Sequence, residues 1–401
     1  MKILDRPKNP RADNKKRMSK RSPMFWFSTV VMCAIFFSAL RWLLAQSGPD
    51  RIADSTAQLY FTFFCGLYCS ILVHEIGHLL AGLACGMRLR MFQVAGIAVR
   101  RGAKGFRIER YKIPGAGGVV LMHPRDENSL DRSAMIRFII GGPLANIVLA
   151  GVVGLIAVAS FPGSISPSIY AALLALAAEN VWIGVANLVP FNTSSGMMSD
   201  GKTIQTLRRQ TPAADRIIAI LMIQRAIFAS VRPRGWSQAW VDRLVFLGDG
   251  SIQDIAALSY KIGFLSDTLG EQAVDAEMEH LQAVLADSKW KTNPIYQLAI
   301  IDVACFQALK RGNADDAEEW LKRVDSWHSA AKPSLKLVEA ACHLARREYS
   351  EAIEAANKHL IFVEDSCKKY GFDSEYSREY TLKLIARAKA ESDETRPILS
   401  S

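Results

Sequence analysis

The feature that most constrains the fold is a run of forty-one residues without a charged side chain, residues 138–178. A helix needs about 20 mostly apolar residues to cross the hydrocarbon core of a bilayer, so this run is long enough for two crossings. Proline and glycine gather within residues 162–167, where they favour a turn over a continuous helix. The run therefore predicts two membrane spans, the second of which continues to about Leu188.

Two further segments meet the same criterion of length and apolarity. One runs from Met24 to Gln46 and contains Arg41 near its end, where a long side chain can reach the interface. The other runs from about Ser55 to Met87. The first could instead be a signal peptide, but its length and the lack of a small-residue cleavage site favour an uncleaved anchor. The predicted fold class is mainly α, with a polytopic membrane core of about four spans.

The distribution of charge predicts the orientation of these spans. Residues 1–23 carry nine basic and two acidic groups, and residues 86–133 carry ten and four. The connections at 47–54 and 161–168 carry almost no net positive charge. Because basic loops stay on the cytoplasmic side, we expect the N-terminal tail, the 86–133 loop and everything after about residue 190 to be cytoplasmic. In a bacterium the membrane would be the cell membrane.

The formal net charge of +10 divides into two unlike halves. Residues 1–232 carry a net charge of +16, and residues 233–401 carry −6. A basic set of loops beside membrane spans indicates contact with lipid, so the sequence predicts membrane lipid as a partner and no nucleic acid.

The second predicted span contains His74-Glu75-Ile76-Gly77-His78. On a helix the i, i+4 spacing places both imidazoles on one face, within reach of one zinc ion. Glu75 follows the first histidine, where a carboxylate can accept a proton from water at the metal as a general base. Ionisable side chains are costly inside a membrane helix, so a functional role is favoured over two packed core histidines.

A zinc site of this kind needs a third protein ligand. Asp200 follows the last predicted span, on the same predicted face of the membrane as His78. Glu179 is the first alternative, although it lies several turns deeper, and His123 on the basic loop is the second.

Three motifs, each on a membrane span, occur in a specific order: HExxH at 74–78, Gly-Gly-Pro-Leu-Ala-Asn at 141–146, and Asn-x-x-Pro at 187–190, which leads to Asp200-Gly201. Together they resemble the site-2 protease family of intramembrane zinc metalloproteases, peptidase family M50, over roughly residues 55–205. Family members usually have a short connection between this proline and the aspartate, whereas nine residues, 191–199, intervene here.

The resemblance implies roles for individual residues. It implies one Zn²⁺ per chain, bound by His74, His78 and Asp200, with Glu75 as the catalytic base. It also implies contact with substrate for three further residues: Asn146, Asn187 and Pro190. For Asn146, packing between helices beside small residues is an equal alternative.

The basic loop has strand-like patterning. Residues 87–101 alternate loosely, and residues 106–122 contain β-branched and aromatic side chains with Gly and Pro, so two to four short strands are expected. An exposed strand edge could pair with an unwound substrate. Alternatively, the basic residues only hold the loop at an anionic membrane surface.

After the spans, residues 217–231 are apolar but too short to cross a bilayer and contain Arg225, which favours an amphipathic helix at the membrane surface over a span.

We divide the chain into a basic tail (1–23), a membrane metalloprotease core (24–232), a linker (233–266) and a helical soluble domain (267–395).

The soluble domain contains an internal similarity. Residues 311–317 align with residues 346–352, and an Ala- and Leu-rich helix precedes each. The spacing resembles tetratricopeptide repeats (TPRs), with helix pairs expected at 269–288 with 292–310, 314–326 with 333–346, and 350–369 with 376–391. An ordinary helical bundle is the alternative. Helical arrays of this kind bind protein partners.

The leading hypothesis is a zinc metalloendopeptidase that cuts a membrane-anchored protein within or near the bilayer. Its cytoplasmic helical domain would recruit substrate or a protein partner. The alternative is a non-catalytic, zinc-binding membrane scaffold, against which the intact Glu75 argues. A metal transporter is disfavoured because Glu179 is the one further acid in the predicted membrane helices.

Overall fold

The computed structural model describes residues 38, 52–102, 104–111, 116–126, 131–160, 165–193, 196–370 and 374–395. The predicted basic tail and the span predicted at 24–46 lie outside these residues, apart from residue 38. The chain divides into two compact units. One comprises residues 1–70, 143–192 and 198–202, and the other comprises 71–142, 193–197 and 203–401.

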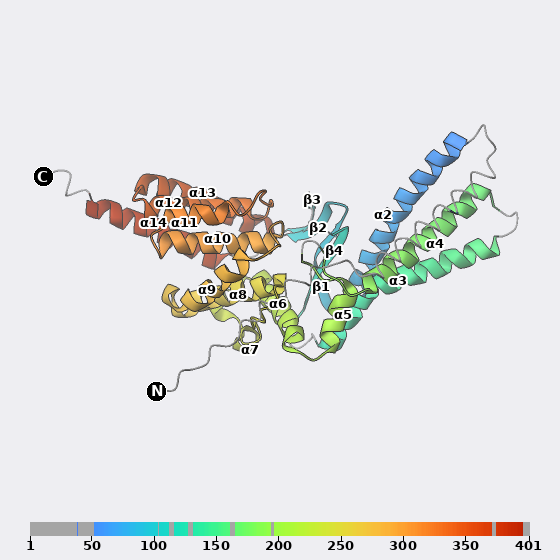
Figure 1. Ribbon diagram of the computed structural model, residues 1–401, viewed down its shortest axis with the longest axis horizontal. Helices are drawn as coiled ribbons and strands as arrows, with labels where there is room; N and C mark the ends of the chain where they lie inside the picture. The colour runs from blue at the N-terminus through green and yellow to red at the C-terminus, as the bar shows by residue number, and fades with distance from the viewer. Residues whose placement is uncertain are drawn as a thin grey trace. The chain divides into compact units, whose positions relative to one another are not determined.

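Three helices are long and apolar enough to cross a membrane within the described residues. They are α2 (Ile52–Ala84), α3 (Arg132–Ala159) and α4 (Pro167–Leu188). In the first unit their segments lie side by side (Figure 1). They coincide with three of the predicted spans, so a mainly helical membrane protein is confirmed at this level.

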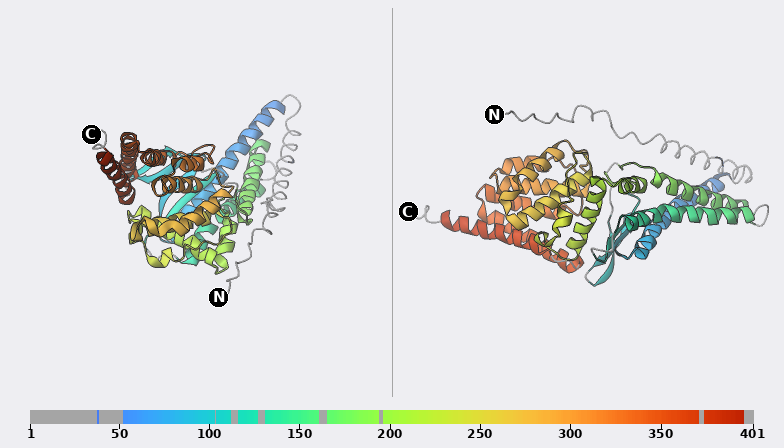
Figure 2. Two further views of the ribbon diagram at one scale, coloured as in Figure 1. Left: turned by 60° about the vertical axis from the view of Figure 1, so that its left-hand side comes forward. Right: turned by 90° about the horizontal axis from the view of Figure 1, so that it is seen from below.

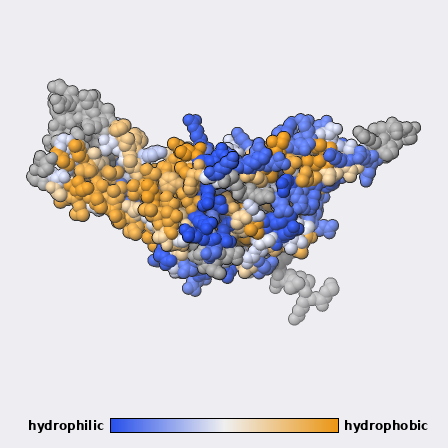
Figure 3. Space-filling view, turned by 180° about the vertical axis from the view of Figure 1, so that it is seen from behind, coloured by the Kyte–Doolittle hydropathy of each residue, from blue (hydrophilic) through white to orange (hydrophobic). Residues whose placement is uncertain are grey.

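These helices are apolar on the outside and polar where they meet. Phe61 on α2 and Leu155 on α3 are 71% and 72% exposed, and the surface of this region is hydrophobic (Figure 3). Inside, the Asn146 amide donates to the Ser70 carbonyl over 2.8 Å and to the side-chain oxygen of Asn180 over 2.7 Å. This inverted pattern suits helices that face lipid, where polar side chains must find partners within the protein.

The second unit contains a four-stranded antiparallel sheet in the order β3-β2-β1-β4. The strands are β1 (Met87–Val94), β2 (Ile97–Gly102), β3 (Gly105–Arg110) and β4 (Gly118–Pro124). A two-residue turn joins β1 to β2, with φ of 49° at Ala95 and 84° at Gly96, as tight hairpins require. Two to four strands were expected here, and the structure has four.

Two helices follow the spans: α5 (Asp200–Arg208) and α6 (Pro212–Phe228). The apolar residues of α6 are buried against protein, in clusters that include Met87 of β1 and Met135 of α3. The expectation of a membrane-surface helix at 217–231 is therefore wrong for this face of the helix. Tertiary packing covers the same apolar side chains that a bilayer would.

The remaining helices form a stacked array (Figure 2). Their bounds are α7 (Gln238–Val241), α8 (Ile252–Leu269), α9 (Asp275–Ala286), α10 (Pro294–Leu309), α11 (Ala314–Leu321), α12 (Leu335–Ala345), α13 (Tyr349–Tyr370) and α14 (Glu375–Thr395). Short 3₁₀ turns lie at Pro233–Gly235, Glu271–Val274 and Lys332–Ser334. One apolar cluster runs through α8 to α14. The range taken as a linker, 233–266, contains α7 and most of α8.

Helices α9 to α14 occupy the positions of the expected pairs. The two aligned turns share an unusual backbone conformation, with φ of 67° at Gly312 and 61° at Arg347. In each, a backbone N–H next to the positive-φ residue donates to a carbonyl five residues earlier, from Arg311 to Phe306 before Gly312 and from Glu348 to His343 after Arg347. These features agree with an internal repeat, but its assignment as a tetratricopeptide repeat stays a prediction.

Candidate metal centre

His74 and His78 lie one turn apart on α2, and both are buried, at 6% and 7% exposure. Their Nε2 atoms are 3.2 Å apart, and the two rings are close to perpendicular, at 85°. The helix alone accounts for this pairing, because residues four apart lie on the same face.

A backbone carbonyl orients His78. Its Nδ1 lies 3.1 Å from the carbonyl oxygen of Phe138 on α3. A carbonyl only accepts, so Nδ1 carries the hydrogen and the neutral ring presents its lone pair at Nε2. Metal-bound histidines are commonly held by such a second hydrogen bond, which leaves the other nitrogen to bind.

Asp200 is the first residue of α5, and Ser199 caps that helix. The hydroxyl of Ser199 accepts from the backbone N–H of Lys202 over 3.2 Å and of Phe191 over 3.1 Å. It donates to the carbonyl of Val189, after the end of α4, over 2.7 Å. One buried hydroxyl thus connects the start of α5 to the end of α4.

The nine residues between Pro190 and Asp200 are joined to one another at their two ends. Asn192 pairs with Met198 in an antiparallel bridge, and the Ser199 N–H donates to the Phe191 carbonyl over 2.9 Å. The two ends of the insertion therefore meet. Its length does not displace the aspartate from the end of α4.

Gly201 allows this close approach. A β-carbon at this position would overlap the backbone carbonyl of Leu188. Backbone cannot yield as a flexible side chain can, so the contact requires glycine next to the aspartate.

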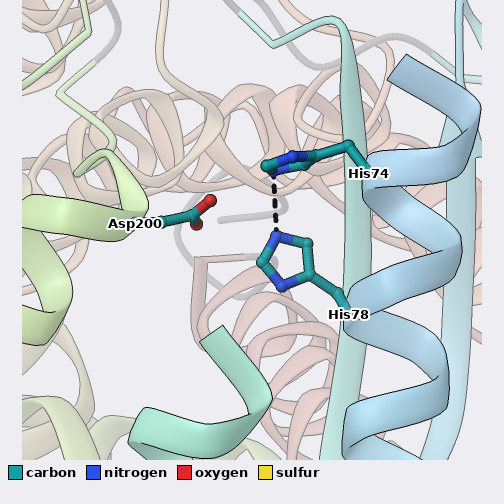
Figure 4. Close-up of side chains that lie close together, drawn as sticks. All are labelled: His74, His78 and Asp200. Carbon is teal, nitrogen blue, oxygen red and sulfur yellow. Dashed lines mark hydrogen bonds between the residues drawn. The ribbon is translucent and has the colours of Figure 1, made fainter. Parts of the chain in front are cut away.

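The metal-binding atoms of His74, His78 and Asp200 all lie within 4.8 Å of one another. The carboxylate of Asp200 points toward the two imidazoles (Figure 4). In the described part of the chain this is the one group of three or more such residues that could hold a metal ion. Glu179 and His123, the two alternative third ligands, lie outside it.

The donor set fits zinc. Two nitrogens at about 2.0–2.1 Å from a tetrahedral ion would lie about 3.3 Å apart, close to the 3.2 Å between the two Nε2 atoms. Two imidazoles and one carboxylate also leave a fourth position for water or substrate, as in catalytic zinc sites.

Two glycines of α3 admit the histidine face of α2, and the sequence patterns did not mark them as part of the site. A β-carbon on Gly142 would overlap the ring of His78, and one on Gly141 would overlap Ala81. The pair of small residues was the available signal, but it also fits ordinary packing between membrane helices.

Glu75 is 6% exposed and lies against strand β4. A β-carbon on Gly118 of that strand would come within 2.5 Å of a carboxylate oxygen of Glu75. The missing side chain at Gly118 therefore makes the space that Glu75 occupies. The acid lies on α2 directly beside His74, at the edge strand of the sheet.

The three residues that the resemblance links to substrate lie in different surroundings. Asn146 is fully buried, and both hydrogens of its amide are used within the helices. Asn187 donates to the Ile183 carbonyl over 3.0 Å, and Pro190 is exposed. The contacts of Asn146 favour the helix-packing alternative.

Glu179 and His123, the two alternative third ligands, have other surroundings. Glu179 is 1% exposed, packs against Gly66 of α2, and neither of its carboxylate oxygens has a hydrogen-bond partner among the described residues. His123 contacts the Pro124 carbonyl through Nδ1, and its Nε2 accepts from Arg90 over 2.6 Å. Burial, helped by nearby arginines, lowers the pKa of His123.

Two buried histidines on an apolar helix, with a half-buried aspartate facing them, form a set of side chains that could hold a metal ion for hydrolysis. The sequence profile of peptidase family M50 matches residues 62–163, which include both histidines and the motif at 141–146 but end before the motif at 187–190 and Asp200. This part of the chain is therefore similar to metallopeptidases of the site-2 protease kind, and three of the described helices are long and apolar enough to cross a membrane. Comparison with curated proteins gives no match, and comparison with solved structures gives none either.

Proposed function

We propose that this chain is an intramembrane zinc metalloprotease that hydrolyses a peptide bond of a membrane-anchored protein within or near the bilayer. One observation carries the proposal. The atoms of His74, His78 and Asp200 that could bind a metal lie within 4.8 Å of one another. The buried Glu75 follows His74 on helix α2.

His74, His78 and Asp200 would hold the zinc ion. Bound zinc supplies a Lewis acid for the scissile carbonyl and lowers the pKa of water to about 7. The carboxylate of Glu75 takes a proton from the attacking water and passes it to the amide nitrogen as the C–N bond breaks. The carbonyl of Phe138 would accept from Nδ1 of His78 and so leave Nε2 of this ring available to the metal.

Strand β4 is suited to present the substrate. A membrane helix hides its peptide bonds, so a segment must unwind before cleavage. An unwound segment can add to a sheet edge through backbone hydrogen bonds. Because β4 is an edge strand and its Gly118 packs on Glu75, a segment paired there would lie beside the base. Asn187 and Pro190 would contact the substrate from the end of α4.

The helical domain would recruit the substrate or a protein partner. Within the second unit, α13 contacts the β2–β3 hairpin: Lys369 pairs with Glu109 over 3.0 Å, and Tyr370 donates to the same carboxylate over 3.3 Å. Arg100 of β2 lies over the Tyr370 ring at 5.1 Å. A partner bound to the array would thus be held near the sheet. The distribution of charge supports a cytoplasmic location for both the N-terminus and this domain.

The deciding experiment compares wild type with Glu75→Gln in the full-length protein, reconstituted with candidate single-span substrates. We expect wild type to release a fragment in a zinc-dependent manner. The variant should cleave about 10²–10⁴-fold more slowly, because it lacks the general base. Glu179→Gln makes the same acid-to-amide change in a neighbouring helix and should keep its activity.

Zinc content must be measured on each variant. Glu75→Gln should retain zinc, since Glu75 is not a ligand in this proposal. Equal cleavage by wild type and Glu75→Gln would contradict the mechanism. Zinc retention without cleavage of any tested substrate would favour the non-catalytic scaffold.

A further inference from the structure

The helical array encloses a cavity of about 470 Å³, a size typical of sites for small molecules. Its walls come mainly from α8, α10 and α14, all within the second unit. The lining is mostly apolar and aromatic, and it includes the rings of Tyr260, Tyr376 and Tyr380. None of the residues of the candidate metal centre lines this cavity, and the proposed proteolysis does not use it.

Asp302 of α10 projects into this cavity. Its side chain is exposed to the cavity, yet it is surrounded by protein. Among the described residues its carboxylate has no hydrogen bond and no ion pair. Burial without a partner raises the pKa of Asp302 to about 7. An ionised acid that is surrounded by protein and has no partner is partly desolvated, and such groups gather at binding sites.

The arginine and the lysine that line the cavity are already paired with other acids. Arg232 contacts Asp267 at 2.5 Å and Glu379 at 2.9 Å. Lys310 contacts Asp275 at 2.6 Å. Neither of these two cations is free to pair with Asp302. The carboxylate of Asp302 therefore has no counter-ion in the cavity, and a cationic ligand would supply one.

The aromatic side chains add to this preference. Tyr376 and Tyr380 follow each other by one turn of α14, with ring centroids 6.4 Å apart. Ring faces attract cations, most strongly where water is excluded. The hydroxyl of Tyr376 is held by Ser266 over 3.2 Å, which fixes that ring against α8.

We propose that this cavity binds a small organic cation, one ammonium or guanidinium group on an apolar body, with Asp302 as the counter-ion. The apolar body would lie against the aromatic wall. The chemistry of the cavity thus assigns the helical array a site for a small ligand, which is a different role from the proposed recruitment of a protein.

The test is isothermal titration calorimetry, in which 2-phenylethylamine is added to the full-length, detergent-solubilised protein and its affinity is measured. Its neutral counterpart 2-phenylethanol and its anionic counterpart 3-phenylpropanoate serve as matched ligands. We expect the amine to bind at least tenfold more tightly than either. Asp302→Asn should remove that preference, whereas Glu319→Gln, an exposed acid-to-amide change on α11, should preserve it.

A second variant tests the cavity without changing its charge. Gly263 of α8 lines the cavity, and a β-carbon there would meet no atom within 4 Å. Gly263→Leu should fill the space and abolish binding of the amine while the protein remains folded. Equal binding of the three ligands would overturn the proposal, and so would unchanged amine binding by Asp302→Asn. A basic peptide that binds at Asp302 when small amines do not would contradict the assignment to a small ligand.

Discussion

Gly142 of α3 lies against the imidazole of His78 on α2, so closely that a β-carbon would overlap the ring. The same stretch of α3 provides the Phe138 carbonyl that accepts from His78 Nδ1. One helix therefore both orients this histidine and leaves the space for it. The Gly-Gly pair is part of the metal centre, although neither glycine offers a ligand atom.

The first prediction concerns these glycines. Gly142→Ala should push the His78 ring out of position and weaken zinc binding by at least about tenfold, the effect of losing a group that orients a ligand. Gly151→Ala on the same helix is the control, because a β-carbon there meets no atom within 4 Å. Zinc content after dialysis against graded chelator measures the difference. Equal zinc retention by both variants would show that the close approach is irrelevant.

The second prediction concerns the third ligand. Asp200→Asn should lower zinc affinity by more than about tenfold, since even residues that only support ligands contribute that much. Glu179→Gln and His123→Gln should leave zinc affinity unchanged, because both residues lie outside the ligand group. Competition with a zinc-binding dye gives the affinities. Loss of zinc in Glu179→Gln alone would transfer the third ligand to α4.

The third prediction concerns the cap of α5. Ser199→Ala removes the hydroxyl that joins Lys202, Phe191 and Val189, so it should destabilise this region by about 1–2 kcal/mol and weaken zinc binding as Asp200 loosens. Thr193→Ala removes a hydroxyl from the same loop that accepts from Met197. It should affect zinc affinity less. Thermal unfolding with and without zinc separates the two effects, and similar losses in both variants would argue against the cap.

The fourth prediction concerns a buried ion pair between α6 and α8. Arg216 and Asp254 are 1% and 0% exposed and contact each other directly. Removing one partner leaves a buried charge, so Arg216→Met should cost about 3–5 kcal/mol. The double variant Arg216→Met/Asp254→Leu should recover part of that loss. Lys322→Ala, at an exposed pair with Glu319, should cost about 0–1 kcal/mol. Tryptophan fluorescence during denaturation reports each change.

The fifth prediction concerns pH. Burial raises the pKa of Asp302 from its usual 3.8 to about 7 in the folded protein, so the folded state binds this proton more tightly than the unfolded chain. The resulting stabilisation is present at acidic pH and is lost as pH rises through about 7. Asp302→Asn should therefore raise the Tm at pH 8 more than at pH 5, in the absence of a cationic ligand. A pH-independent difference in Tm would contradict the assignment.

Much of the fold follows from local sequence patterns. The charge-free run and its Pro–Gly interruption predict α3 and α4, because apolar length alone determines whether a helix can span a bilayer. The aligned turns predict the helices on either side of Gly312 and Arg347, because the backbone conformation there is local. The apolar pattern at 217–231 was misleading, because a bilayer and a protein core select the same side chains.

In the candidate site, too, local sequence patterns predict some residues and the tertiary structure decides the others. His74, Glu75 and His78 lie within five residues on one helix, so the helical period alone places both imidazoles together. Asp200 lies more than a hundred residues later, and three acids or histidines were open as the third ligand. The joined ends of residues 191–199 and the contact of Gly201 with Leu188 bring Asp200 into the group.

The sequence by itself predicted three membrane helices, the candidate metal-binding histidines and the adjacent glutamate, because each depends on length, composition or spacing within one element. Tertiary structure alone decided which third side chain joins the histidines, the glycines that admit His78, the space for Glu75 beside β4, and the position of Asp302 without a charged partner in the cavity. These depend on backbone approach between segments distant in sequence, where the absence of a β-carbon or of a charged partner leaves no periodic signal.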